Sequence, residues 1–189
     1  MKSHCPRNVL RFVFAGLCAS VLALPTLAAP QEAPQAQTSA DRGYLTEHGK
    51  FILHKFEQPI GEETYRLDYG PDSLLVEMDF KFTDRGSPVP LTASFRSAKD
   101  LTPAAFEIKG KNSRLSAIDQ AVEVQPENVR LRDRDKWTEA ARPKQFFTIA
   151  GYAPATMQML MVRYWATHGS PAELSTLPSG RVKIEPRGQ

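Results

Sequence analysis

The stretch "LLVEMDFKFTDRGSPVPLTASFR", residues 74–96, decides the fold of this chain. Apolar side chains occupy every second position from Leu74 to Phe82, and again from Val89 to Phe95 after the turn "DRGSP". This period of two is typical of strands with one buried face and one solvated face. Because the connecting turn has only a few residues, we expect the two strands to pair antiparallel.

The same pattern extends in both directions from this stretch. Upstream, "FILHKF" (51–56) and "ETYRLDY" (63–69) predict two more strands, with "EQPIG" and "GPDS" as turns, so that residues 49–96 form a four-strand meander. Downstream, "FEIKG", "SRLSAID", "AVEVQ" and "KQFFTIA" predict shorter strands. "NVRLRDRDKW" predicts a hairpin with its tip near 133–135, and a short helix through 135–144 is the alternative.

"YAPATMQMLMVRYWATHG", residues 152–169, predicts an amphipathic helix. Pro154 suits its first turn, and Gly169 suits a C-terminal cap. One apolar face contains the residues Met157, Leu160, Met161, Tyr164 and Trp165. "SPAE" (170–173) resembles a capping box that opens a helix of one or two turns, and "RVKIE" (181–185) predicts a last strand.

These elements predict an α+β domain of about nine or ten antiparallel strands and one helix. A long twisted meander needs a cover for its apolar face, so we expect a curved half-barrel wrapped around the helix. The apolar face from Met157 to Trp165 then completes the core. The alternative is that the same face lines a cavity for a ligand or contacts a partner.

The N-terminus is typical of an export signal. A basic start precedes the apolar run "FVFAGLCASVLAL" (12–24), which is short for a membrane span. Small residues follow, and we predict cleavage after Ala28, with Ala29 as a second choice and an uncleaved membrane anchor as the alternative. We therefore expect a periplasmic or secreted protein with a signal peptide at 1–28, a disordered linker at 29–48 and one β-rich domain at 49–189.

Removal of the signal peptide changes the charge and the cysteine content. The formal net charge of +3 equals the three basic residues within 1–28, so the mature chain is neutral and predicts no nucleic-acid partner. Both cysteines, Cys5 and Cys18, also lie in this segment. The mature chain therefore has no disulfide and no thiolate metal site.

No motif of the mature chain predicts catalysis, a metal or a cofactor. His48, His54 and His168 form no HxH or HExxH pattern, and we expect them to be structural. The methionines at 157, 159 and 161 are better explained as core fillers than as soft-metal ligands. The acidic pairs 62–63 and 77/79 predict solvated surface, because nothing places one carboxylate in an apolar pocket.

Several long segments of the chain, however, resemble one family. "FILHKFEQPIGEETYRL", "DFKFTDRGSPVPLTASFR" and "FFTIAGYAPATMQMLMVRYWATHGSPAELSTLPSGRVKIEPRG" resemble the N-terminal region of secreted bacterial amidohydrolases of the imidazolonepropionase-like group. The resemblance implies a region that precedes a metal-dependent TIM-barrel hydrolase. That barrel begins with an HxH metal pair, which this sequence lacks, so no catalytic residue carries over.

Three functions are consistent with this sequence. The first is a non-catalytic accessory domain of an exported amidohydrolase, either a fragment that lacks its last strands or a free-standing version that meets a catalytic domain in cis or in trans. The second is a binding module for an apolar or lipid-like ligand. The third, an independent hydrolase, has no residues to support it.

Overall fold

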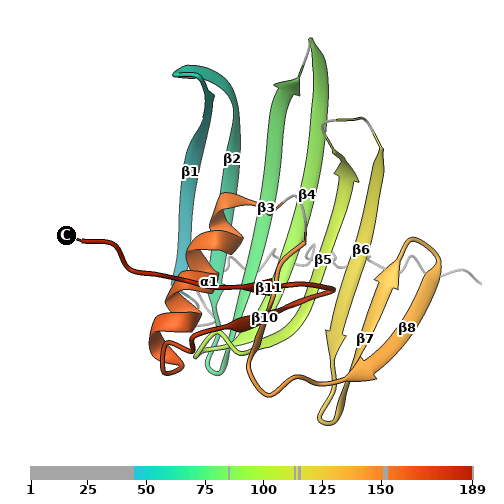
Figure 1. Ribbon diagram of the computed structural model, residues 1–189. Helices are drawn as coiled ribbons and strands as arrows, with labels where there is room; N and C mark the ends of the chain where they lie inside the picture. Colours follow the sequence, from blue (N-terminus) through green and yellow to red (C-terminus); the bar gives the residue numbers. More distant parts are fainter. Residues whose placement is uncertain (1–44, 85, 113, 115, 151–152, 189) are drawn as a thin grey trace, which may run out of the picture. The chain divides into compact units, whose positions relative to one another are not determined.

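Eight consecutive strands form one open antiparallel sheet in which each strand is hydrogen bonded to its neighbours in sequence (Figure 1). The computed structural model describes residues 45–84, 86–112, 114, 116–150 and 153–188, all of which lie in one compact unit. The strands of this meander are β1 (Leu45–Lys55), β2 (Gln58–Tyr69), β3 (Ser73–Asp84), β4 (Ser87–Ala98), β5 (Pro103–Lys111), β6 (Ala117–Val124), β7 (Asn128–Asp133) and β8 (Lys136–Ala141).

The strand register places the alternating apolar side chains in rows that cross the sheet. One row runs from Leu67 through Val76, Phe95 and Phe106 to Val122, and each of these residues is paired with the next. All five are almost completely buried. The sheet therefore has one apolar face, as the period of two predicts, and its other face carries the polar residues of the same strands.

A helix and a second, three-stranded sheet pack against the apolar face (Figure 1). The helix is α1 (Ala155–Thr167), and the small sheet has the order β11 (Arg181–Val182), β10 (Leu174–Leu177), β9 (Phe146–Thr148). β9 and β10 are parallel, so α1 is the crossover that joins them. Gly169 follows α1 with φ +81°, and the amide of Ser170 donates to the carbonyl of Trp165 (3.0 Å), which ends the helix as predicted.

The turn between β1 and β2 has an unusual backbone. Lys55 pairs with Gln58, and the two residues between them, Phe56 and Glu57, have φ of 50° and 64°. A two-residue turn with positive φ at both positions favours Asn and Gly. Non-glycine residues cost roughly 1–2 kcal/mol each in this left-handed region. The turn is therefore built from residues that are poor for its geometry.

The structure confirms the α+β class, the meander over 49–96 and the hairpin around 133–135, where β7 pairs with β8. The alternative helix through 135–144 is wrong. The prediction of two separate strands in "SRLSAID" and "AVEVQ" is also wrong, because β6 runs from Ala117 to Val124 as one strand and Gln120 between them pairs on both sides. The signal peptide 1–28, the cleavage after Ala28 and the linker up to 44 lie outside the described residues.

Two further predictions are corrected by long-range pairing. Residues 45–48 belong to β1 rather than to a linker, because they pair with 66–69 and the hydroxyl of Thr46 donates to Asp68 (2.7 Å). The expected helix after 170 is instead strand β10, parallel to β9. Leu174 and Leu177 are buried in this strand, so tertiary packing overrides the local capping signal.

Candidate functional site

The predicted helix face mainly fills the core. Met157, Leu160, Met161 and Tyr164 are buried. The ring of Phe147 in the small sheet lies 5.4 Å from the ring of Tyr164 in the helix and 5.3 Å from the ring of Phe95 in the meander. Phe147 therefore contacts both of the other layers. Trp165 is half-buried at the edge of this face, and its indole N–H donates to the carbonyl of Pro171 (2.9 Å). The ring of Tyr164 therefore helps to pack the helix against the rest of the core.

Met161 has a second role, because it also lines a groove of about 620 Å³ beside the helix. This groove lies between α1, β6 and the three-stranded sheet. Its apolar lining includes Ile149, Met161 and Val182. Its polar lining includes Gln120, Gln158, Thr176, Ser179 and Arg181. Of the five residues predicted as a ligand or partner face, Met161 is the one that lines this groove.

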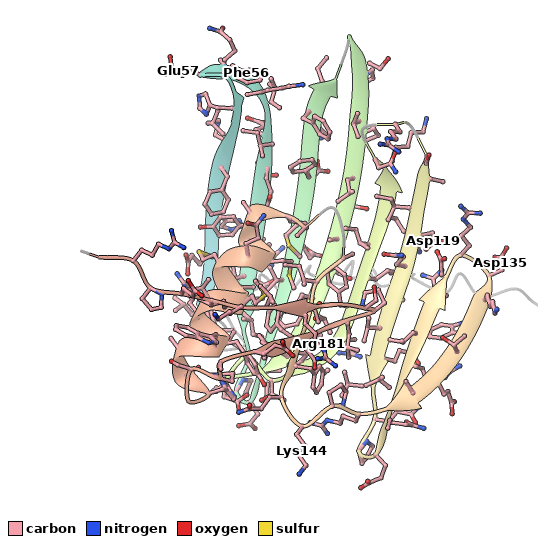
Figure 2. The ribbon with its side chains drawn as sticks, viewed as in Figure 1. Phe56, Glu57, Asp119, Asp135, Lys144 and Arg181 are labelled. Atoms are coloured by element: carbon pink, nitrogen blue, oxygen red, sulfur yellow. The ribbon has the colours of Figure 1, made fainter. Side chains whose placement is uncertain are left out.

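One wall of the groove is fixed by the turn between β10 and β11. The amide of Thr176 donates to the carbonyl of Gly180 (3.0 Å), and its hydroxyl donates to the carbonyl of Ser179 (2.9 Å). Gly180 has φ +104°, a conformation that suits glycine. Arg181, labelled in Figure 2, is exposed at the rim. It forms an ion pair with Glu173 at 3.0 Å.

A buried carboxylate holds the N-terminal end of the helix. Glu63 of β2 is fully buried and accepts hydrogen bonds from the amide of Ala155, the amide of Thr156 (2.9 Å) and the hydroxyl of Thr156. The helix has no side-chain cap from Pro154 and no acidic residue in its first turn. Glu63 therefore supplies the anion that a helix N-terminus favours, from a distant strand.

The prediction that the pair 62–63 is solvated is thus wrong for Glu63 and right for Glu62. Alternation along β2 turns adjacent residues to opposite faces, so one side chain enters the core and the other remains outside. Glu62 forms an ion pair with Lys50 at 3.4 Å, and both side chains are about half exposed. Glu77 and Asp79 lie on the polar face as predicted, with Asp79 paired to Lys81 at 3.1 Å.

His168 lies at the C-terminal end of the helix, as predicted, and has structural contacts. Its ring stacks on that of Tyr164 at a centroid distance of 3.9 Å, and its Nε2 lies 3.5 Å from Asp100. A hydrogen bond from the backbone N–H of Thr102 is the main cause of the lowered pKa of Asp100. Burial raises the pKa of Tyr164. These contacts join the β4–β5 turn to the helix.

His48 lies on the polar face, where it lines a shallow groove of about 480 Å³ with Arg66 and Glu77. Within the described part of the chain, no group of three or more His, Cys, Asp or Glu residues is arranged to hold a metal ion. Met157 and Met161 are buried in the core and Met159 packs against it, consistent with their predicted role as fillers. Among the described residues, no helix is long and apolar enough to cross a membrane.

Comparisons of the chain with protein-family models, curated proteins and solved structures found no match. The resemblance to the N-terminal region of amidohydrolases therefore stays a prediction.

Proposed function

We propose that the protein is an exported binding module in which the meander forms a half-barrel around an amphipathic α1. The ligand would be an apolar or lipid-like molecule bound in the groove beside α1. One observation carries this proposal: the groove of about 620 Å³ combines an apolar wall with polar groups at its rim. Ligand sites typically have about 300–1,000 Å³ and this same mixture of groups.

The lining residues favour a ligand with an apolar chain and an anionic group. Ile149, Met161 and Val182 offer apolar surface to the chain. Arg181 offers a guanidinium to a carboxylate or phosphate at the rim. Its present partner, Glu173, is exposed, and an exposed ion pair contributes only about 0–1 kcal/mol, so a ligand anion can replace it.

The other function predicted from the sequence, an accessory domain of an amidohydrolase, stays a prediction. The groove favours the binding module instead. In this proposal the export signal predicted at 1–28 gives the location, because the module would meet its ligand outside the cytoplasm.

Isothermal titration of the exported protein with dodecanoate, and with dodecanol as the uncharged analogue, tests the proposal. We expect saturable binding of one dodecanoate per chain, and weaker binding of dodecanol. Absence of saturable binding for both molecules contradicts the proposal.

Variants of the rim locate the site. Ser179 lines the groove and is exposed, so Ser179→Trp should fill the groove. We expect binding to weaken about tenfold, which corresponds to about 1.4 kcal/mol. Ala172→Trp adds the same ring at an exposed position outside the groove and should bind normally. Arg181→Glu should affect dodecanoate more than dodecanol, whereas Lys183→Glu on the same segment should affect neither.

A further inference from the structure

The eight-stranded sheet has a long open edge at β1. Among the described residues, β1 pairs with β2 on one side and with no strand on the other (Figure 1). It has eleven residues, whereas the strand at the other edge, β8, has six. An exposed edge is a template for another strand, and proteins usually keep such edges short or cover them. The length of β1 therefore points to a partner strand.

Apolar side chains on both faces of β1 are left partly uncovered. Ile52 lies on the polar face of the sheet and is 48% exposed. Phe51 and Leu53 lie on the opposite face and are half-buried. The ring of Phe51 packs on that of Tyr65 at a centroid distance of 5.6 Å, and its other neighbours would come from beyond the edge. A strand paired with β1 would cover all three side chains.

The charges of β1 determine which strand can pair with it. Charged side chains on an edge strand oppose pairing unless the partner has the opposite charge at the facing position. Glu47 lies near the start of β1 and Lys55 at its end, and both are exposed. When two β1 strands pair antiparallel with Phe51 opposite Phe51, Glu47 of each chain faces Lys55 of the other. The strand is therefore complementary in charge to a second copy of itself.

Other antiparallel self-pairings of β1 are less favourable. With Lys50 at the centre, the two Lys50 ammonium groups face each other, and in the register centred on the preceding residue Lys50 faces His48. In the register centred on Phe51, Lys50 faces Ile52, and its own charge is paired with Glu62 at 3.4 Å within the chain. The remaining facing pairs of this register are His48 with His54 and Gly49 with Leu53.

We propose that two copies of this chain pair through β1 to form a dimer with one continuous sheet. A two-fold axis perpendicular to the sheet relates the two chains and passes between their Phe51 residues. The interface is isologous, because the same surface of each chain meets itself. Glu47 and Lys55 form two equivalent ion pairs across it. The groove beside α1 is lined by residues from 120 onward, so the dimer does not rest on the proposed function.

Sedimentation velocity of the exported protein over a range of concentrations tests this inference. We expect a monomer–dimer equilibrium. Glu47→Lys and Lys55→Glu should each raise the dissociation constant about tenfold, because each places two like-charge pairs in the interface. The double variant, Glu47→Lys with Lys55→Glu, should restore the parent value. Within one chain the two residues are roughly 26 Å apart along an extended strand, so this rescue requires a second chain.

A second pair of variants separates the edge from the rest of the sheet. Ile52→Lys places a lysine opposite Lys50 of the other chain and should raise the dissociation constant at least about tenfold. Leu75 is 41% exposed on β3, inside the sheet, so Leu75→Lys should dimerise as the parent does. A monomer at every concentration overturns the inference. Protection of the β1 amides from hydrogen exchange in that monomer would assign the edge to another segment of the same chain. A dimer that the double charge reversal fails to restore also overturns the inference.

Discussion

Glu63 offers the sharpest test of how this fold is held together. Its carboxylate is fully buried and accepts three hydrogen bonds from the first residues of α1. Glu63→Gln keeps the shape of the side chain but places an NH₂ group against backbone and hydroxyl donors. The substitution also removes the negative charge from the helix N-terminus.

The expected cost follows from these contacts. A hydrogen bond to a charged group contributes about 1.5–3 kcal/mol, and an unsatisfied buried donor costs about 1–3 kcal/mol. Because the glutamine oxygen can still accept some of these three hydrogen bonds, we expect Glu63→Gln to lower the free energy of unfolding by about 2–4 kcal/mol. At about 2–4 °C for each kcal/mol, a loss of 3 kcal/mol lowers Tm by about 6–12 °C.

Urea unfolding followed by far-UV circular dichroism measures this loss, and thermal melting gives the change in Tm. The control is Glu62→Gln at the adjacent residue, whose ion pair with Lys50 is exposed and contributes at most about 1 kcal/mol. If the two variants unfold at the same urea concentration, the carboxylate of Glu63 does not anchor the helix and the reasoning is refuted.

Three further predictions follow from other contacts. The pKa of Asp100 is lowered from its ordinary 3.8 by the amide of Thr102, so its contribution to stability is present above that pH and is lost as pH falls through the lower folded-state pKa. Urea unfolding of Asp100→Asn should therefore show a smaller loss of unfolding free energy as pH falls below 3.8. Replacing 56–57 by Asn-Gly should raise the urea midpoint by the equivalent of about 1–2 kcal/mol, and an unchanged midpoint would show that the turn is unstrained. Leu160→Ala removes a buried helix residue and should cost about 2–5 kcal/mol in the same assay, whereas Val162→Ala on the exposed side of the helix should cost less than about 1 kcal/mol.

The strands of the meander could be predicted because their signal is local. Alternation from Leu74 to Phe82 is produced by one strand lying on one core, and short turns leave antiparallel pairing as the available arrangement. The helix could be predicted for the same reason. Its apolar period, its proline start and its glycine end all lie within 152–169.

The features that the sequence could not predict depend on contacts between distant residues. Leu174 and Leu177 have the i, i+3 spacing of a helix face, and pairing with the parallel strand β9 overrides this local signal. Glu63 appears in the sequence as one of two adjacent acids, and its burial becomes visible only when α1 is placed over β2. The groove combines residues of β6, α1 and the β10–β11 turn, so no local pattern marks it.

The parallel pairing of β9 with β10 has a consequence for the order in which the protein folds. Every pairing in the meander joins strands that are adjacent in sequence, and such local contacts form early. The pairing of β9 with β10 closes a loop that contains the whole of α1, so we expect this contact to form later. In pulsed hydrogen exchange during refolding, the amides of β3 and β4 should therefore gain protection before those of β9 and β10. We therefore expect the groove beside the helix to form last.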